Sequence, residues 1–374
     1  MKASVIEFIL TIKLFFFSRW RKVTGGRKRY PRVVQLPITY NCNSKCVMCN
    51  IWQMDYSNEF TLEEFDRFTQ DRIFSKVEYL GINGGEPTLI KELPQFAGII
   101  LKNLPKLKAL NIITHGFNKK QLFPALENIY AQCKAANVKF HAAISLDGVG
   151  KIHDTVRGLK VSKLTQSSIL EIVNHPGKYC DTFDVGCTVV KQNVDYLTEL
   201  KIFAEENNIP IKFRMGIENK RIESQLLTDQ FSLLYDESIQ SSREFFHRLY
   251  VESNNWLERF KYFSIYYFLV VKEKRRLLGC HWKDNGMTMD SRGDLYYCAV
   301  ESEKIGSLRE DSGEKIFFSD ENINYRKTII EDHCNNCIHD YTGTTEANNV
   351  FFFLKSYLSD KFYWVKFYLK AKLI

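Results

Sequence analysis

The chain has 374 residues, and its 45% hydrophobic and 26% charged content is ordinary for a globular protein that buries a large core. The formal net charge of +8 is moderate and no nucleic-acid-binding module occurs, which argues against nucleic acid as a partner. Ten cysteines in so long a chain do not form a small disulfide scaffold, and seven of them fall at metal-ligand spacings. This pattern predicts a reducing compartment, with the cytoplasm as the default.

Residues 1–29 form an N-terminal extension, in which an apolar run from Val5 to Phe17 precedes a basic cluster. The run is shorter than the roughly 20 residues that a bilayer span needs, and no small-residue cleavage site follows it. Two interpretations stay open. The run forms a helix on an anionic membrane surface, or it packs on the protein itself or on a partner.

Residues 30–222 alternate between extended and helical patterns. Strands are predicted over 33–39, 77–83, 110–114, 139–146, 183–190 and 209–215, and helices after the capping box at Thr61–Glu64, over 93–103 and around 121–136. Such alternation predicts parallel strands joined by crossover helices. Six units are fewer than the eight of a closed barrel, so we expect an α/β fold with an open, partial (β/α)6 TIM-type barrel.

The first predicted strand leads directly into Cys42, Cys46 and Cys49, at C-x3-C-x2-C spacing. Three thiolates this close can ligate three corners of a cubane iron–sulfur cluster, and the fourth iron is then open to a substrate or cofactor. A three-cysteine zinc site completed elsewhere and three unrelated buried thiols are the alternatives. Gly84-Gly85-Glu86-Pro87 and Ser145-Leu146-Asp147-Gly148 follow two further strands, at the sheet edge where such folds carry their chemistry.

The rest of the chain divides into three predicted parts: a helical connecting segment at 223–278, a cysteine-containing domain at 279–340, and an aromatic and basic tail at 341–374. The middle part contains a predicted hairpin, 287–290 with 295–297, turned at Gly293. Its cysteines are Cys280, Cys298, Cys334 and Cys337. Four thiolates can hold one cubane cluster or one structural zinc. For Cys133, Cys180 and Cys187 we expect core packing, with Cys187 a candidate hydrogen donor if it faces the barrel interior.

In combination, these motifs resemble the radical S-adenosylmethionine (SAM) superfamily with a C-terminal SPASM or twitch-type auxiliary cluster domain. The resemblance implies two [4Fe-4S] clusters and SAM, which chelates the open iron of the first cluster. It places Gly84, Gly85, Glu86 and Pro87 at the methionine amino group of SAM, Ser145 and Arg157 near its carboxylate or ribose, and Asn193 near its ribose or adenine. Met48 stands where the family often has an aromatic residue near adenine.

The resemblance also implies a reaction. An electron from the first cluster cleaves SAM, and the 5′-deoxyadenosyl radical abstracts a hydrogen atom from substrate. The auxiliary cluster favours a net oxidation, with peptide maturation or epimerisation as the alternative and a zinc-stapled adaptor protein as the non-enzyme alternative. The short segment before the barrel favours a small, sugar-type substrate over a peptide. An external donor such as flavodoxin or ferredoxin is implied, and the residues give no catalytic acid or base.

Overall fold

The computed structural model describes residues 29–234, 236–340 and 342–371, with side chains up to residue 359. The predicted extension at 1–29 therefore lies, apart from residue 29, outside the described residues. The chain forms two compact units. We call Lys28–Ser242 with Asn285–Cys334 the barrel unit, and Arg243–Asp284 with the chain from Asn335 onwards the helical unit.

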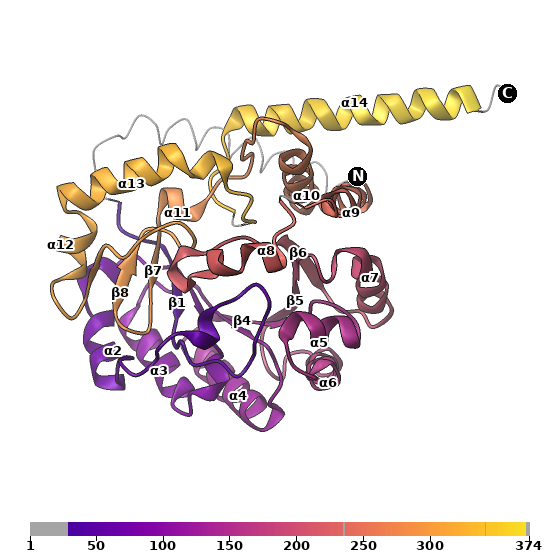
Figure 1. Cartoon of the computed structure of the whole chain (residues 1–374). Coiled ribbons are helices and arrows are strands. Elements are labelled where there is room, and N and C mark those ends of the chain that lie inside the picture. The colour runs from indigo at the N-terminus through magenta and orange to yellow at the C-terminus, as the bar shows by residue number, and fades with distance from the viewer. Residues whose placement is uncertain (1–28, 235, 341, 372–374) are drawn as a thin grey trace. The chain divides into compact units, whose positions relative to one another are not determined.

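The barrel unit contains one nine-stranded sheet (Figure 1). Its strands are β1 (Val33–Pro37), β2 (Tyr79–Asn83), β3 (Ala109–Thr114), β4 (Lys139–Ser145), β5 (Thr182–Val189), β6 (Ile211–Met215), β7 (Gly286–Met289), β8 (Asp294–Tyr296) and β9 (Gly306–Ser307). The order is β6-β5-β4-β3-β2-β1-β7-β8-β9, and β1 to β6 are parallel. Among the described strands, β6 and β9 are the two edges, so the predicted partial barrel is confirmed and is open.

Crossover helices connect the parallel strands and lie outside the curved sheet in Figure 1. They are α2 (Leu62–Thr69), α3 (Leu93–Asn103), α4 (Lys119–Ala135), α5 (Lys151–Arg157), α6 (Ser162–Asn174) and α7 (Leu197–Glu206). The short α8 (Thr228–Phe231) follows β6. The capping box is confirmed, because Thr61 Oγ1 accepts from the Glu64 N–H at 3.2 Å and Glu64 Oε2 accepts from the Thr61 N–H at 3.1 Å. The predicted bounds of α3 are also confirmed.

The two faces of the sheet differ in polarity. Leu36, Ile82, Ile112 and Ala142 are paired across β1 to β4 and are fully buried. One residue away on each strand, the other face presents a row of register partners across β7, β1, β2, β3 and β4, namely Thr288, Gln35, Gly81, Asn111 and His141. Apolar burial therefore fixes the register, and polar side chains line the opposite face.

The predicted hairpin is confirmed as β7 and β8, which pair antiparallel through Thr288 and Tyr296. The structure adds that β7 pairs parallel with β1, which extends the barrel sheet with the cysteine-containing part of the chain. Helices α12 (Gly313–Phe317) and α13 (Asp320–Asp332) follow β9. The sequence did not predict the pairing of β7 with β1, because a four-residue strand carries no mark of its partner.

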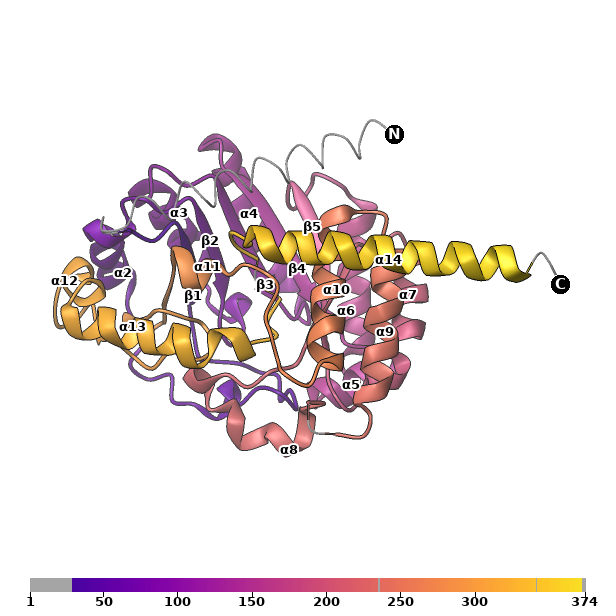
Figure 2. The same ribbon diagram turned by 90° about the horizontal axis from the view of Figure 1, so that it is seen from above.

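The helical unit contains most of α9 (Ile239–Glu252), and α10 (Trp256–Val270), α11 (His281–Asp284) and α14 (Ala347–Ala371). Helices α9 and α10 run side by side, as Figure 2 shows, and aromatic pairs such as Tyr250–Phe263, with ring centroids 5.2 Å apart, join them. Phe353 of α14 is fully buried against Trp256 and Phe260, at 4.9 Å from each ring. None of the helices in the described chain is long and apolar enough to cross a membrane.

Candidate metal centre

Residues Tyr40–Asn50, which we call the cluster loop, follow β1 at the carboxyl edge of the sheet. Cys42 and Cys49 pack against one apolar cluster of Tyr40, Ile51 and Ile222, and the Cys49 N–H donates to the Cys46 carbonyl at 3.2 Å. Among the described side chains, no three histidine, cysteine or acidic groups converge on a point that would hold one metal ion. Thiolates of a cubane bind separate irons, and the loop carries three of them within eight residues.

The turn after β2 holds the cluster loop from one side. The Gly85 N–H donates to the Thr39 carbonyl at 2.6 Å, and the Glu86 N–H donates to the Asn41 carbonyl at 2.9 Å. A Cβ atom on Gly85 would collide with the Asn41 carbonyl, and Gly84 has a φ of +134°. Glycine is therefore required here because two backbones meet directly.

The end of α5 holds the cluster loop from the other side. The Lys45 N–H donates to the Arg157 carbonyl at 3.1 Å and the Val47 N–H to the Val156 carbonyl at 3.0 Å. Gly158 ends the helix with a φ of +68°, and a Cβ atom there would collide with the Lys45 carbonyl. Three backbone hydrogen bonds to the loop, and a fourth to Thr39 directly before it, thus fix it between two neighbouring segments.

Arg157 places a buried positive charge beside the loop. Its Nη1 lies 3.5 Å from Cys46 Sγ, and its Nη2 lies 2.6 Å from Asp147 Oδ2. Burial opposes the charge, but Asp147 and Cys46 outweigh burial and raise the pKa of Arg157. Asp147 is itself held, because its Oδ1 accepts from the Thr188 N–H at 2.8 Å.

The Glu86 side chain is directed into the protein. It is 1% exposed and accepts from Thr114 Oγ1 at 2.6 Å and from the His115 N–H at 2.9 Å. His115 Nε2 lies 2.6 Å from Asn43 Oδ1 on the cluster loop. Burial lowers the pKa of His115, so its ring is neutral, and the Phe117 N–H donates to Nδ1 at 3.1 Å. The carboxylate therefore orients the end of β3, which in turn contacts the loop.

The remaining predicted SAM residues lie around the same edge. Asn193 is fully buried, and its amide donates to the carbonyls of Asp147 and Thr188, each at 2.9 Å. Ser145 ends β4 in register with Gly186 and is partly exposed. Met48 packs against an apolar cluster of residues from α5, the end of β5 and α8, namely Val156, Val190 and Phe231.

Comparison with known proteins identifies the family. Residues 36–182 match the model of the radical SAM superfamily, and residues 280–338 match that of an iron–sulfur cluster-binding domain, SPASM. The chain belongs to the radical SAM superfamily. A radical SAM protein with a SPASM domain binds SAM, a site-differentiated [4Fe-4S] cluster and an auxiliary [4Fe-4S] cluster. The zinc-stapled adaptor alternative is therefore set aside.

Individual relatives are distant. Fe-coproporphyrin III synthase of Methanosarcina barkeri is 27% identical over 48% of this chain and 42% of its own length. GTP 3′,8-cyclase of Nautilia profundicola is 24% identical over 54% of this chain and 64% of its own. The chain thus spans less than two thirds of these curated relatives. SuiB of Streptococcus suis, solved with SAM, shares the fold at a TM-score of 0.53 and 18% identity, covering 80% of this chain and 68% of SuiB.

The donor set of the radical SAM loop fits its cluster. Burial raises the pKa of Cys42 to about 12 and that of Cys49 to about 11, so both are protonated thiols near neutral pH when no metal compensates them. Bound iron stabilises the thiolate form, because a cysteine that ligates a metal loses its thiol proton. The loop supplies three thiols and leaves one corner of a cubane for SAM.

The cysteines at the SPASM positions come from three segments of the chain: that of Cys280, that of Cys298, and the one that carries Cys334 and Cys337. In the helical unit, the Arg276 side chain contacts backbone carbonyls at Cys337 and directly before Cys280. Its guanidinium donates to the carbonyls of Cys337 at 3.0 Å, His339 at 2.7 Å and Gly279 at 3.3 Å. A Cβ atom on Gly343 would collide with the Cys280 backbone, so the segments around Gly343 and Cys280 are in direct backbone contact.

In the barrel unit, Cys298 follows β8 and its Sγ accepts from the Val300 N–H at 3.4 Å. Cys334 begins a single 3₁₀ turn, Cys334–Asn336, after α13. Four cysteines suffice for one auxiliary cluster. Cys187 does not line the polar face of the sheet: it is fully buried with Val185 and Val189, whereas Gly186 and Thr188 on the opposite face are partly exposed. That position removes it as a hydrogen donor to substrate.

Two arginines near the cysteines escaped prediction from sequence. Arg221 follows β6 and contacts Tyr40, with its Nη1 3.4 Å from the hydroxyl and its guanidinium 5.7 Å from the ring centroid. Arg276 ends the basic run Lys272-Glu273-Lys274-Arg275-Arg276. Neither stands at a diagnostic spacing, so only the folded contacts give them a role.

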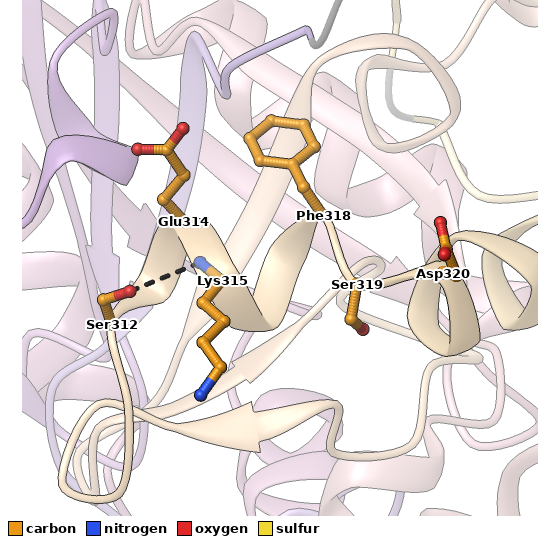
Figure 3. Close-up of a pocket in the computed structure, with 6 residues that line it drawn as sticks. All are labelled: Ser312, Glu314, Lys315, Phe318, Ser319 and Asp320. Atoms are coloured by element: carbon orange, nitrogen blue, oxygen red, sulfur yellow. Dashed lines mark hydrogen bonds between the residues drawn. The ribbon is translucent and has the colours of Figure 1, made fainter.

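A surface cavity of about 450 Å³ lies elsewhere in the barrel unit, at the junction of α12 and α13 (Figure 3). Its Ser312 and Ser319 are the N-caps of these helices and accept from backbone N–H groups at 3.4 and 3.2 Å. Glu314 accepts from the Tyr30 hydroxyl at 2.5 Å. These groups serve the local fold, and no cysteine lines the cavity.

Proposed function

We propose that this protein is a radical SAM oxidoreductase that removes two electrons from a small, polar, hydroxyl-bearing substrate. The observation that supports it is the pairing, in one chain, of an open three-cysteine loop with a four-cysteine SPASM set. When bound, the first cluster and SAM supply a radical that abstracts a hydrogen atom, and an auxiliary cluster is suited to accept the second electron.

The chain's own residues would position SAM. Gly84 and Gly85 let the backbone approach its amino group, while Glu86 and Pro87 hold that turn. We assign Arg157 and Ser145 to the carboxylate or ribose side. Met48 would pack on adenine through its thioether. Asn193, whose amide is bonded to the Asp147 and Thr188 carbonyls, would shape the ribose side by holding two strand ends together.

The polar face of the sheet supports a hydrogen-bonding substrate. Three side-chain oxygens on this face are buried and have no hydrogen-bond partner in the described part of the chain: those of Thr288, Asn83 and Asn111. Unpaired buried acceptors cost free energy, about 1–3 kcal/mol each, unless a ligand or water donates to them. Donors such as hydroxyl or amine groups would satisfy them, which favours a sugar-type molecule.

Peptide maturation or epimerisation is the second candidate. SuiB has been solved with its precursor peptide SuiA, at a TM-score of 0.53 to this chain. A peptide also offers N–H donors. The products separate the two cases, because oxidation leaves a product two hydrogen atoms lighter, whereas epimerisation in D₂O leaves the mass raised by one incorporated deuterium.

The decisive experiment is anaerobic reconstitution followed by iron counting and a 5′-deoxyadenosine assay with SAM and dithionite. We expect about eight irons per chain and deoxyadenosine formation, both tested against a Cys42→Ala, Cys46→Ala, Cys49→Ala chain that should hold about half the iron and form no nucleoside. Equal SAM cleavage in that chain would disprove the proposal. Flavodoxin or ferredoxin in place of dithionite then tests the proposed physiological donor.

We also propose peripheral membrane contact through the termini. On α14, Phe351 and Leu358 lie seven residues apart and are 58% and 53% exposed, an apolar pair on one helix face. Binding to vesicles of phosphatidylcholine with phosphatidylserine should weaken on deletion of residues 2–17 and on Phe351→Ser with Leu358→Ser. Unchanged vesicle binding in both chains would rule the termini out.

A further inference from the structure

A buried carboxylate connects the cluster loop to the hairpin that leads to Cys298. Asp290, at the end of β7, is 1% exposed, and its Oδ2 accepts from the Tyr40 hydroxyl at 2.8 Å and from the Tyr296 hydroxyl at 3.1 Å. Tyr40 stands two residues before Cys42, and Tyr296 stands two residues before Cys298. One side chain therefore fixes both cysteine-bearing segments.

The other oxygen of Asp290 is also satisfied. Its Oδ1 accepts from the backbone N–H groups of Arg292 at 2.9 Å and Asp294 at 3.0 Å, which closes the turn between β7 and β8. Four hydrogen-bond donors thus surround this buried carboxylate. Asp290 is thus a fixed anchor point, and the position of the Tyr40 hydroxyl depends on the hairpin.

The Tyr40 ring in turn holds two positive charges. The guanidinium of Arg221 lies 5.7 Å from the ring centroid and that of Arg292 lies 5.1 Å from it. Arg221 Nη1 also donates to the Tyr40 hydroxyl at 3.4 Å. The same ring packs in the apolar cluster that contacts Cys42 and Cys49. A cation is therefore held next to two of the three cysteines of the cluster loop.

Arg221 lies over the ring that packs with Cys42 and Cys49, so its charge acts on the cluster that these cysteines would hold. A cubane with three thiolates carries negative charge, and its reduction adds one more. A nearby cation stabilises the reduced form and raises the reduction potential.

We propose that Tyr40 and Asp290 are positioning residues that hold Arg221 beside the SAM-binding cluster, so that its charge makes that cluster easier to reduce. The hairpin before Cys298 thereby influences the potential of the first cluster through Asp290. The inference needs only the cluster that the family binds, and neither the substrate nor the oxidation of the proposed function. A failed substrate assay and a failed test of this network are consequently distinguishable.

The test is an EPR-monitored redox titration of the full-length, reconstituted protein with and without SAM, because only the signal of the SAM-binding cluster changes when SAM is added. In Arg221→Gln we expect the ratio of reduced to oxidised first cluster at a fixed potential to fall about tenfold, which is about 59 mV for a one-electron couple. Arg221→Lys keeps the charge and should shift less. Tyr40→Phe keeps the ring that Arg221 lies over but removes the hydroxyl that contacts Arg221 and Asp290, so the potential should shift in the same direction by less than in Arg221→Gln.

Tyr297→Phe is the matched control, since that buried hydroxyl donates to the Phe317 carbonyl at 2.5 Å and not towards the cluster loop. It should leave the titration unchanged, with iron at the wild-type level. An unaltered potential of the SAM-sensitive signal in Arg221→Gln would overturn the proposal, as would an equal shift in Arg221→Lys. If Arg221→Gln binds less iron, Tyr40→Phe decides, and a wild-type potential there overturns the proposal.

Discussion

The cluster loop and the SPASM cysteines are held in opposite ways. Three cysteines of the cluster loop share one short segment, which backbone hydrogen bonds from Gly85 and Glu86 and from the end of α5 fix on two sides. The SPASM cysteines come from three segments, and in the helical unit the Arg276 side chain donates to the backbone at Cys337 and next to Cys280. The first site is held mainly by backbone contacts at strand ends, whereas side chains such as Arg276 hold the segments of the second.

This difference indicates that metal binding contributes more to the folding of the SPASM site than to that of the cluster loop. Backbone contacts formed by the sheet keep the cluster loop in place before any iron arrives, so its cluster enters a prepared site. A site assembled from separate segments gains part of its structure from the metal itself, because binding free energy is then folding free energy. We therefore expect the auxiliary cluster to be the more easily lost of the two.

The largest effect is expected from a substitution that disrupts the cluster loop. In Gly158→Ala, the new Cβ atom would collide with the Lys45 carbonyl. The first cluster should be lost, iron should fall to about half, and deoxyadenosine formation should stop. Gly177→Ala is the matched control, because Gly177 has a similar φ of +76° with nothing within 4 Å of the added atom. Both substitutions carry a conformational cost of about 1–2 kcal/mol, so equal iron in the two chains would contradict this prediction.

The second prediction concerns a substitution that weakens the site of the SPASM cysteines. Arg276→Met removes donors to the Cys337, His339 and Gly279 carbonyls, so the auxiliary cluster should be lost and iron should again fall to about half. The SAM-sensitive EPR signal and deoxyadenosine formation should persist. Arg275→Met serves as control, since Arg275 contacts Asn349. Loss of the first cluster in Arg276→Met would show that the two sites do not differ as described.

The sequence predicts the surroundings of the cluster loop more fully than those of the SPASM cysteines, and the reason is physical. Parallel strands bring every strand end to one edge, so Cys42, Gly84 and Ser145 could be placed together from their order along the chain. Which atoms a side chain then meets depends on packing: Glu86 turned inward to Thr114 and His115. Arg221 and Arg276 act through contacts between distant segments, and a lone arginine in a sequence carries no spacing that indicates such a contact.

The third prediction asks how much an ion pair adds to the backbone contacts of the prepared site. Asp147→Asn leaves the Arg157 charge buried without its partner, 2.6 Å away in the wild type. Removing one member of a buried pair costs about 3–5 kcal/mol, which urea unfolding of the metal-free protein should reveal. Asp154→Asn, nearby on α5, affects only acceptor bonds to the Val161 and Ser162 N–H groups. It should cost about 1 kcal/mol, and equal costs would argue against a strong Asp147–Arg157 pair.

The smallest effect is a pH dependence on the same side of the cluster loop. His153 of α5 accepts from the Asp147 N–H at 3.1 Å and is fully buried. Burial, with the charge of Arg157, lowers the pKa of His153 to about 2, against about 6.5 in the unfolded chain. Between these values the unfolded state binds a proton that the folded state does not. Stability is therefore intact above about pH 6.5 and falls as the pH decreases, by up to about 1.4 kcal/mol per pH unit.

His153→Asn keeps an acceptor near the Asp147 N–H but cannot titrate, so its stability should fall less steeply than that of the wild type between pH 6.5 and 5. His175→Asn is the control, because the His175 side chain is 50% exposed, and it should leave the slope unchanged. Urea unfolding of the metal-free chains at several pH values measures the difference. If the pH profiles of wild type and His153→Asn are parallel, His153 takes up its proton in the folded state as it does in the unfolded chain. The end of α5 that contacts the cluster loop would then be accessible to water.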